Sequence, residues 1–415
     1  MRAPGRSNRR AAGEVEASAV AWAIDGVDDR AVAAAARLME HGVRVRVAGE
    51  RFELGGAELA RGSLLLLPAD NARFAGDLAA RIDATADELD LPVVSLTTGL
   101  GDGDLPDIGG GHFTLLEPPR IALASRGYVS TLGFGEIWHL LDQKIGIRHS
   151  HLDFDTLDFA DLRRYNVLVL PNLWWGDLEE STRKSLEAWV EAGGTLVAVA
   201  GGAAQLTGKD SSLSRVRRLP DVLDRLDDFE LAVLREWMAE RSVLPPADQT
   251  WSHVLAEEPE YPWSDLAALT RPSTAELERR DEWQRMFMPQ GAMLAARVDQ
   301  RHWLTAGTGP VLPVLFLAGY YGSAGVLMAE SGVEAPIRFG VLSPSDDATA
   351  ARRVGWGPVP AGQDLHLRMS GLLWPEAAVR IANSAFVTRE CRGNGQVILS
   401  SGAEEPRSYQ RRAPV

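Results

Sequence analysis

Short apolar runs alternate with helical patterns between residues 118 and 200. The apolar runs predict strands and the amphipathic stretches predict helices; in chain order these are strand 121–124, loop 127–135, helix 136–144, strand 147–152, helical turn 159–164, strand 167–170, helix 178–192 and strand 196–200. Strands that alternate with helices in this way favour a parallel, doubly wound sheet with helices on both faces. The sequence therefore predicts an α/β fold.

A smaller α/β pattern precedes this region. Its predicted elements are strand 19–24, helix 28–41, strand 43–47, strand 64–67, helix 71–89 and strand 92–96. We therefore expect a compact α/β unit over 17–97, preceded by a disordered tail over 1–16. Gly and Asp are frequent over 98–117, which predicts a linker or surface loop between the two regions.

Residues 205–300 break the alternation, because a helix over 219–240 is flanked by polar and Pro-rich stretches. This composition predicts a helical insertion that projects from the sheet. Strand-like runs then return, in chain order at 314–318, 338–342, 385–387 and 396–400, and Arg392-Gly393-Asn394-Gly395 is expected to form a hairpin turn. The larger domain is therefore expected to span 118–405, with a tail over 406–415.

Gly201 and Gly202 follow a predicted strand at the place where many α/β enzymes carry a nucleophile. The predicted strand 196–200 would turn sharply there into the next helix. The turn contains only Gly201, Gly202, Ala203 and Ala204, and none of these side chains can attack a substrate. The sequence thus predicts the framework of an active site without its nucleophile, and no catalytic residue is assigned.

Charge and hydropathy exclude several classes of partner. The chain has 415 residues and a formal net charge of −14, which argues against general affinity for nucleic acids or anionic membranes. No run of about 18 apolar residues occurs, so no membrane span is predicted. Residues 1–10 are rich in arginine, but no apolar segment follows them, so they do not form a signal peptide. The localisation is otherwise open, and cytoplasmic if Met1 is the true start.

Metal and cofactor motifs are absent from the sequence. Cys391 is the only cysteine, which excludes an intramolecular disulfide and a cysteine-based zinc site. No histidine opens an H-x-x-E, and the loop 127–135 lacks a G-x-G-x-x-G. His149 and His151 share one face of a predicted strand, with Asp153 next on that face; this is either a metal-ligand pair or a solvated strand end. We expect no metal and no cofactor.

The carboxyl ends of the predicted strands are the expected binding site, because open α/β sheets bind ligands there. Arg126-Gly127-Tyr128 follows the first strand of the larger domain. The candidate ligand-binding residues at these ends are Tyr128, Asn172, Trp174, Trp175, Gly201 and Gly202. The paired tryptophans could stack on a sugar or an aromatic side chain, or bury against the insertion or a neighbouring domain. The sequence leaves both alternatives open.

Several short blocks resemble a known family. These are Pro-Arg-Ile-Ala-Leu at 119–123, Gly-Glu-Ile-Trp-His-Leu-Leu-Asp at 135–142, Tyr-Asn-Val-Leu-Val-Leu-Pro at 165–171 and Trp-Val-Glu-Ala-Gly-Gly-Thr-Leu at 189–196. They resemble the glutamine-amidotransferase-like domain that follows the catalytic domain of large bacterial M14 zinc carboxypeptidases. The stretch 38–62 resembles the small segment between those domains, and 370–375 and 393–399 resemble the closing strands.

The resemblance implies a flavodoxin-like core of the class I glutamine-amidotransferase kind. It also implies that the zinc site lies in a peptidase domain, upstream or separate, because this chain has neither the zinc motif nor the amidotransferase cysteine. The function expected from it is a non-catalytic accessory or binding domain of an M14-like protein. The alternatives are a carbohydrate-related binding or oligomerisation module, which includes a homo-oligomer, and an unrecognised hydrolase that uses the carboxyl rim of the sheet.

Overall fold

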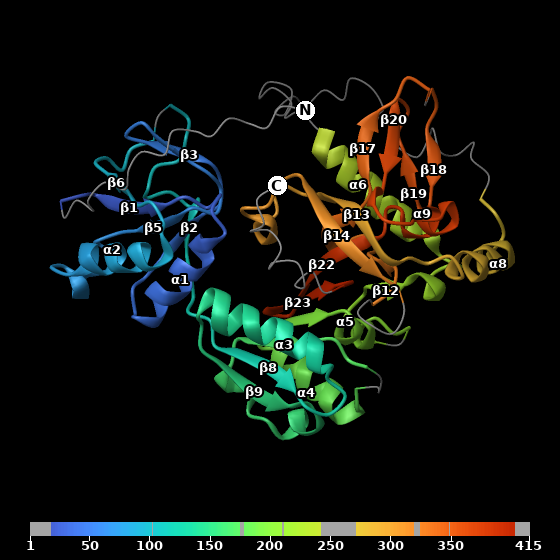
Figure 1. The fold of residues 1–415 in the computed structure, drawn as a ribbon, viewed down its shortest axis with the longest axis horizontal. Helices are drawn as coiled ribbons and strands as arrows, with labels where there is room; N and C mark the ends of the chain where they lie inside the picture. The colour runs from blue at the N-terminus through green and yellow to red at the C-terminus, as the bar shows by residue number, and fades with distance from the viewer. Residues whose placement is uncertain are drawn as a thin grey trace, which may run out of the picture. The chain divides into compact units, whose positions relative to one another are not determined.

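The structure is a computed structural model that describes residues 18–101, 103–174, 178–209, 211–241, 271–318, 324–347 and 349–402 (Figure 1). Its contacts divide the chain into two compact units. Unit 1 comprises residues 1–121, 137–150 and 300–309, and unit 2 comprises 122–136, 151–299 and 310–415. Trp175 and most of the stretch between 241 and 271 lie outside the described residues. No helix in the described ranges is long and apolar enough to span a bilayer.

Unit 1 contains a five-stranded sheet in the order β6-β1-β5-β2-β7. Its strands are β1 (Ala21–Ile24), β2 (Arg46–Ala48), β5 (Leu64–Leu66), β6 (Val94–Leu96) and β7 (Phe113–Leu115). All four neighbouring pairs are antiparallel. The segment predicted as a linker therefore contributes an edge strand, because Phe113 is a buried apolar residue that pairs with Ala48.

The two faces of this sheet have different covers. Helices α1 (Arg30–Glu40) and α2 (Leu78–Leu89) cover the face that carries Trp22 and Ile24 (Figure 1). The hairpin of β3 (Phe52–Leu54) and β4 (Ala57–Leu59) covers the opposite face, on which Ala21 and Ala23 lie. The alternation of large and small residues along β1 thus decides which face receives helices.

Unit 2 is built on a mixed sheet of 12 strands, with the main order β14-β13-β16-β22-β23-β11-β10-β8-β9. We call β9, β8, β10, β11 and β23 the β11 half. Its strands are β8 (Ile121–Ser125), β9 (His149–Asp153), β10 (Val167–Leu170), β11 (Thr195–Val199) and β23 (Gly395–Ser400). The pairs β10–β11 and β11–β23 are parallel.

The β13 half consists of β14, β13, β16 and β22. Its strands are β13 (Gln290–Val298), β14 (Val311–Leu317), β16 (Glu334–Phe339) and β22 (Ala385–Arg392). Each neighbouring pair here is antiparallel, and β22 joins β23 through the expected hairpin, in which Arg392 pairs with Gly395. The predicted α/β class is therefore confirmed. The main sheet is mixed, with parallel pairs in the β11 half and antiparallel pairs in the β13 half.

The stretch predicted as an insertion over 205–300 is part helix and part sheet. It contains α6 (Leu226–Arg241) and α8 (Thr274–Arg285), but near its end it also contains β13, which lies inside the main sheet. The prediction therefore missed β13. In the structure Nη1 of Arg297, on this strand, donates to the carbonyl oxygen of Gly340 at 3.0 Å.

The prediction of a loop over 127–135 is wrong for residues 131–135. Helix α3 begins at Thr131 and continues to His139, followed by a π-helical turn η2 (Leu140–Ile145). Gly133 lies inside α3, and a Cβ there would come within 3.0 Å of the Cβ of Asn172. The glycine therefore permits close helix packing and does not mark a loop.

Candidate functional site

Backbone hydrogen bonds join the loops that follow β8 and β10. The amide of Trp174 donates to the carbonyl oxygen of Tyr128 at 3.0 Å, and the amide of Ser130 donates to that of Asn172 at 2.8 Å. An isolated antiparallel bridge between Val129 and Leu173 lies between these bonds. The structure therefore brings the predicted rim residues Tyr128, Asn172 and Trp174 together at one edge of unit 2.

Asn172 connects this rim to the turn after β11. Its side-chain Oδ1 accepts a hydrogen bond from the Gly201 amide at 2.9 Å, and the residue is only 7% exposed. The side chain is thus engaged in holding two loops together. Tyr128 is exposed and Trp174 is half-buried, so both side chains can be reached from the surface.

The sharp turn after β11 is present, but the residue at its apex is Ala200. Ala200 has φ 51° and ψ −118°, a conformation that residues with a side chain rarely adopt, and α5 (Gly201–Leu206) follows it directly. Its amide donates to the carbonyl oxygen of Ser400 at 2.9 Å. This strand-to-helix geometry is the one that presents a nucleophile in other α/β proteins, and here it presents a buried methyl group.

Gly201 and Gly202 are required by close approach and not by an unusual φ angle. Neither has a positive φ. A Cβ on Gly202 would lie 2.7 Å from the carbonyl oxygen of Leu170 and would also overlap the carbonyl oxygen of Pro171, while a Cβ on Gly201 would lie 2.8 Å from the Leu173 amide nitrogen. The two glycines let α5 start directly against the end of β10.

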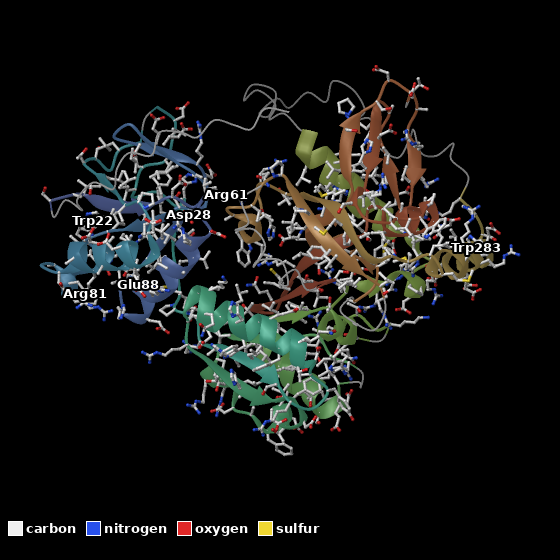
Figure 2. The ribbon with its side chains drawn as sticks, in the orientation of Figure 1. Trp22, Asp28, Arg61, Arg81, Glu88 and Trp283 are labelled. Atoms are coloured by element: carbon white, nitrogen blue, oxygen red, sulfur yellow. The ribbon has the colours of Figure 1, made fainter. Side chains whose placement is uncertain are left out.

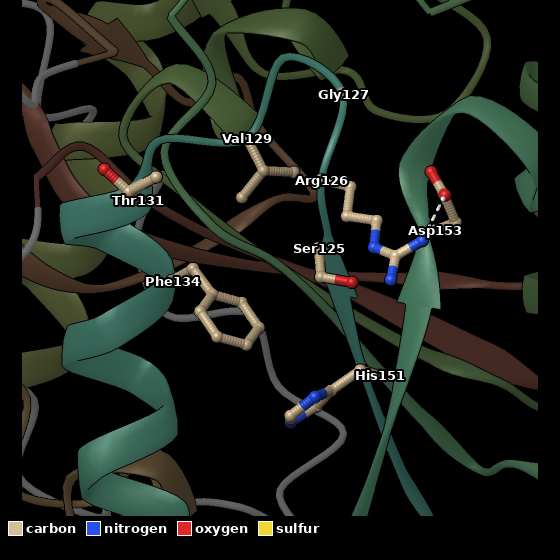
Figure 3. Close-up of a pocket in the computed structure, with 8 residues that line it drawn as sticks. All are labelled: Ser125, Arg126, Gly127, Val129, Thr131, Phe134, His151 and Asp153. Atoms are coloured by element: carbon tan, nitrogen blue, oxygen red, sulfur yellow. Dashed lines mark ion pairs between the residues drawn. The ribbon is translucent and has the colours of Figure 1, made fainter.

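A pocket of about 610 Å³ opens beside this rim, at the carboxyl end of β8 (Figure 3). It is lined by Ser125, Arg126, Gly127, Val129, Thr131, Phe134, His151 and Asp153. The lining comes from the end of β8, the start of α3 and the end of β9. Sequence reasoning named Arg126 apart from His151 and Asp153, and only the adjacency of β8 and β9 places the three around one cavity.

Arg126 is the most exposed charged group of this pocket. It has φ 62°, in the left-handed region, and Gly127 follows with φ 52°. Its guanidinium Nη1 lies 3.6 Å from Asp153 Oδ2, with 80% of the Arg126 side chain exposed (Figure 3). A strained residue that presents a solvated charge at a cavity is a common feature of binding sites. This loose ion pair can exchange Asp153 for an anionic ligand.

Neutral groups complete the pocket wall. The rings of Phe134 and His151 meet edge to face with centroids 5.1 Å apart (Figure 3). The Ser125 hydroxyl donates to the carbonyl oxygen of Leu152 at 3.0 Å. Apolar surface beside one cation, one carboxylate and hydroxyl groups suits a small ligand that carries both charged and apolar parts.

The histidine pair proposed as metal ligands lies on β9. Nδ1 of His149 is 3.0 Å from the carbonyl oxygen of Ile147, while His151 and Asp153 line the pocket. Within the described ranges, no cluster of three or more His, Cys, Asp or Glu side chains has the arrangement of a metal site. The geometry of these residues therefore supplies no metal-ligand set.

One carboxyl group near the pocket has an altered affinity for protons. Burial raises the pKa of Glu136, which lies on α3 two residues after Phe134. Desolvation disfavours the charged carboxylate, so protonation of Glu136 is easier in the folded chain than in water. The residue is not part of the pocket lining.

Comparison with known proteins identifies no family for this chain. No protein-family model and no curated protein matches this sequence. The chain is similar to a β-galactosidase from Bacillus circulans sp. alkalophilus at 12% identity and a TM-score of 0.32, over 68% of this chain and 28% of that one. It is similar to a ThuA-like protein from Bacteroides uniformis at 11% identity and a TM-score of 0.33, over 70% and 84% of the two chains.

A cytoplasmic protein of Salmonella typhimurium LT2 is similar at 12% identity and a TM-score of 0.34, over 71% of this chain and 94% of that one. The chain thus spans less than a third of the length of the β-galactosidase. TM-scores this low establish neither a family nor a shared fold.

Proposed function

We propose that this chain is a non-catalytic binding module whose β11 half is a flavodoxin-like core of the class I glutamine-amidotransferase kind. Numbered along the chain, β9-β8-β10-β11-β23 gives the order 2-1-3-4-5, which is the order of flavodoxin-like sheets. The parallel pairs β10–β11 and β11–β23 support this assignment.

The observation that carries the proposal is Ala200. The chain keeps the strained backbone of a nucleophile-bearing turn, φ 51° and ψ −118°, but the side chain there is a methyl group. A methyl group can neither attack a carbonyl carbon nor donate a proton. A turn of this shape can still fix the ends of neighbouring strands and thereby position a ligand pocket.

The ligand that suits the pocket is a small molecule or chain end with an anionic group. Arg126 supplies an exposed cation, and Phe134 with Val129 supplies apolar surface. On the resemblance to M14 carboxypeptidase-associated domains, we further propose that the module acts beside a zinc peptidase, either as part of a longer chain or as a separate partner.

A binding experiment tests this proposal. Isothermal titration calorimetry of the full chain is carried out with a panel of dipeptides that carry a free C-terminal carboxylate and of dicarboxylates such as succinate. At least one compound should give saturable binding. Arg126→Ala should weaken that binding about tenfold or more, because it removes a charge-assisted hydrogen bond. Arg163→Ala is the matched control, since Arg163 is similarly exposed (89%) and pairs with Asp161 outside the pocket.

Absence of binding across the panel, or equal losses in both variants, would refute the anion-binding proposal. The genomic sequence upstream of the Met1 codon tests the peptidase proposal separately. An H-x-x-E-containing reading frame supports it, and a glycosidase gene there favours the carbohydrate-related alternative.

The hydrolase alternative has one observation in its favour, since Ser125, His151 and Asp153 line the same pocket. Against it, the Ser125 hydroxyl donates to a backbone carbonyl and Asp153 pairs with Arg126. Turnover of p-nitrophenyl esters that is lost in Ser125→Ala would establish this alternative and overturn the non-catalytic one.

A further inference from the structure

Three aromatic rings contact one another in unit 2, far in sequence from the rim pocket; we call them the row, and its successive ring planes are tilted by 57° and 58°. Trp283 lies in the last turn of α8, Phe287 follows the end of that helix, and Trp374 precedes α9 (Pro375–Ile381). The ring centroids of Trp283 and Phe287 are 5.1 Å apart, and those of Phe287 and Trp374 are 6.0 Å apart. Figure 2 shows Trp283 projecting from α8 at the surface.

The two tryptophans of the row are exposed, and Phe287, which contacts both, is half-buried. Trp283 is 55% exposed and Trp374 is 50% exposed. Met286 and Leu372, which lie three and two residues from Trp283 and Trp374 in sequence, are exposed as well, whereas Leu373 is half-buried. Large apolar side chains gathered at a surface mark a site of interaction, whereas isolated ones need no explanation.

A buried ion-pair cluster beneath the row fixes its two supporting helices. Asp281 on α8 is fully buried, and its Oδ1 accepts a hydrogen bond from Arg380 Nε on α9 at 2.7 Å. Arg285 Nε lies 2.9 Å from the other carboxylate oxygen of Asp281. The rings are therefore held in place before a ligand arrives, which lowers the entropy cost of binding.

We propose that Trp283, Phe287 and Trp374 form a stacking platform for a neutral oligosaccharide. The apolar C–H face of a pyranose packs on an aromatic ring, and a row of rings offers successive sugar units successive contacts. The neighbouring Arg280, Glu282 and Arg285 are exposed groups of both signs that can donate to and accept from sugar hydroxyls. The overall charge of −14 disfavours a polyanionic ligand. This site is independent of the rim pocket and of the function proposed for it.

Affinity electrophoresis of the full chain in gels that contain β-glucan, galactan, mannan or xylan tests the platform. At least one polysaccharide should retard the wild-type chain. Trp283→Ala and Trp374→Ala should each raise the dissociation constant about tenfold, because each removes one stacked ring. Trp303→Ala is the matched control and should bind as the wild type does, since Trp303 is equally exposed (55%) but lies in unit 1.

Three results would overturn the proposal. The first is no retardation in any of the four gels. The second is retardation that Trp283→Ala and Trp374→Ala leave unchanged while both variants remain folded by circular dichroism. The third is a concentration-dependent dimer in light scattering that Trp283→Ala abolishes, which would assign the row to a second copy of the chain.

Discussion

The two halves of the unit 2 sheet bury their polar groups in different ways. In the β11 half, the buried Asn172 side chain accepts from the backbone amide of Gly201, and backbones approach so closely that glycine is needed. In the β13 half, buried arginine side chains form ion pairs with carboxylates. Arg338 on β16 donates to both carboxylate oxygens of Glu236 on α6, at 2.6 and 2.7 Å, and Arg380 pairs with Asp281.

The difference teaches how each half is assembled. The partners of the ion pairs are 102 and 99 residues apart in sequence; the first pair fastens α6 to strand β16 of the sheet, and the second fastens α8 to α9. Burial lowers the pKa of the Arg380 guanidinium, and Asp281 opposes this shift by favouring the charged form. Such a pair adds little net stability, but leaving one charge without its partner is costly. The β11 half instead depends on shape, because its close contacts are between backbones.

The largest effect is expected from breaking the ion pair under the aromatic row. Asp281→Ala should lower the free energy of unfolding by about 3–5 kcal/mol, since it leaves Arg380 buried without a carboxylate. Urea denaturation measures this change. Glu276→Ala is the control on the same helix; its pairs with Arg279 and Arg280 are solvent-exposed, so its loss should change the free energy of unfolding far less. Equal losses in the two variants would show that the buried pair of Asp281 matters no more to stability than the exposed pairs of Glu276.

Steric packing in the β11 half predicts the next largest effect. Gly202→Ala should destabilise the chain by about 1–3 kcal/mol, because the new Cβ would overlap carbonyl oxygens at the end of β10. Gly208→Ala is the matched control, as a Cβ there would meet no atom within 4 Å. Thermal unfolding of both variants measures the effect, and an unchanged midpoint for Gly202→Ala would refute the close approach.

The strained turn predicts a change of opposite sign. Ala200→Gly should stabilise the chain by up to about 1 kcal/mol, since relief of the backbone strain exceeds the lost methyl contacts and the added flexibility of the unfolded chain. Ala198→Gly, at a buried position inside β11, should be destabilising. If both variants lose stability equally in urea denaturation, Ala200 is not strained.

Glu136 gives the smallest predicted effect and concerns pH. Because burial raises its pKa, the folded chain binds this proton more tightly than the unfolded chain does. Its contribution to stability is therefore fully present below the usual carboxyl pKa and is lost as pH rises through the raised value. Glu136→Gln should stabilise the chain at pH 7 by about half a kcal/mol or less, because the side chain keeps part of its exposure to water.

The comparison of melting temperatures at pH 4 and pH 7 tests this sign. The gain from Glu136→Gln should be larger at pH 7 than at pH 4. A larger gain at pH 4 would show that the carboxylate, and not the neutral acid, is the favoured form in the folded chain.

The sequence by itself determined much of the β11 half. Apolar runs of β-branched and leucine residues predicted β10 and β11. The sequence also showed that no nucleophile follows β11, although it placed the turn at Gly201-Gly202 and the apex is Ala200. These features are local, because a strand pattern or a missing side chain is contained in a few consecutive residues. The 393–394 turn of the C-terminal hairpin was predictable for the same reason.

Only the tertiary structure decided the rest. The sequence predicts a loop at Gly133, whereas in the structure this glycine lies in a helix packed against Asn172. The sequence places β13 in an insertion, whereas in the structure Arg297 of this strand donates to the carbonyl oxygen of Gly340. Nothing near Asp281 in sequence indicates Arg380, and nothing near Trp283 indicates Trp374. The pocket and the aromatic row are therefore properties of the fold, because each brings together side chains whose proximity depends on contacts across many residues of chain.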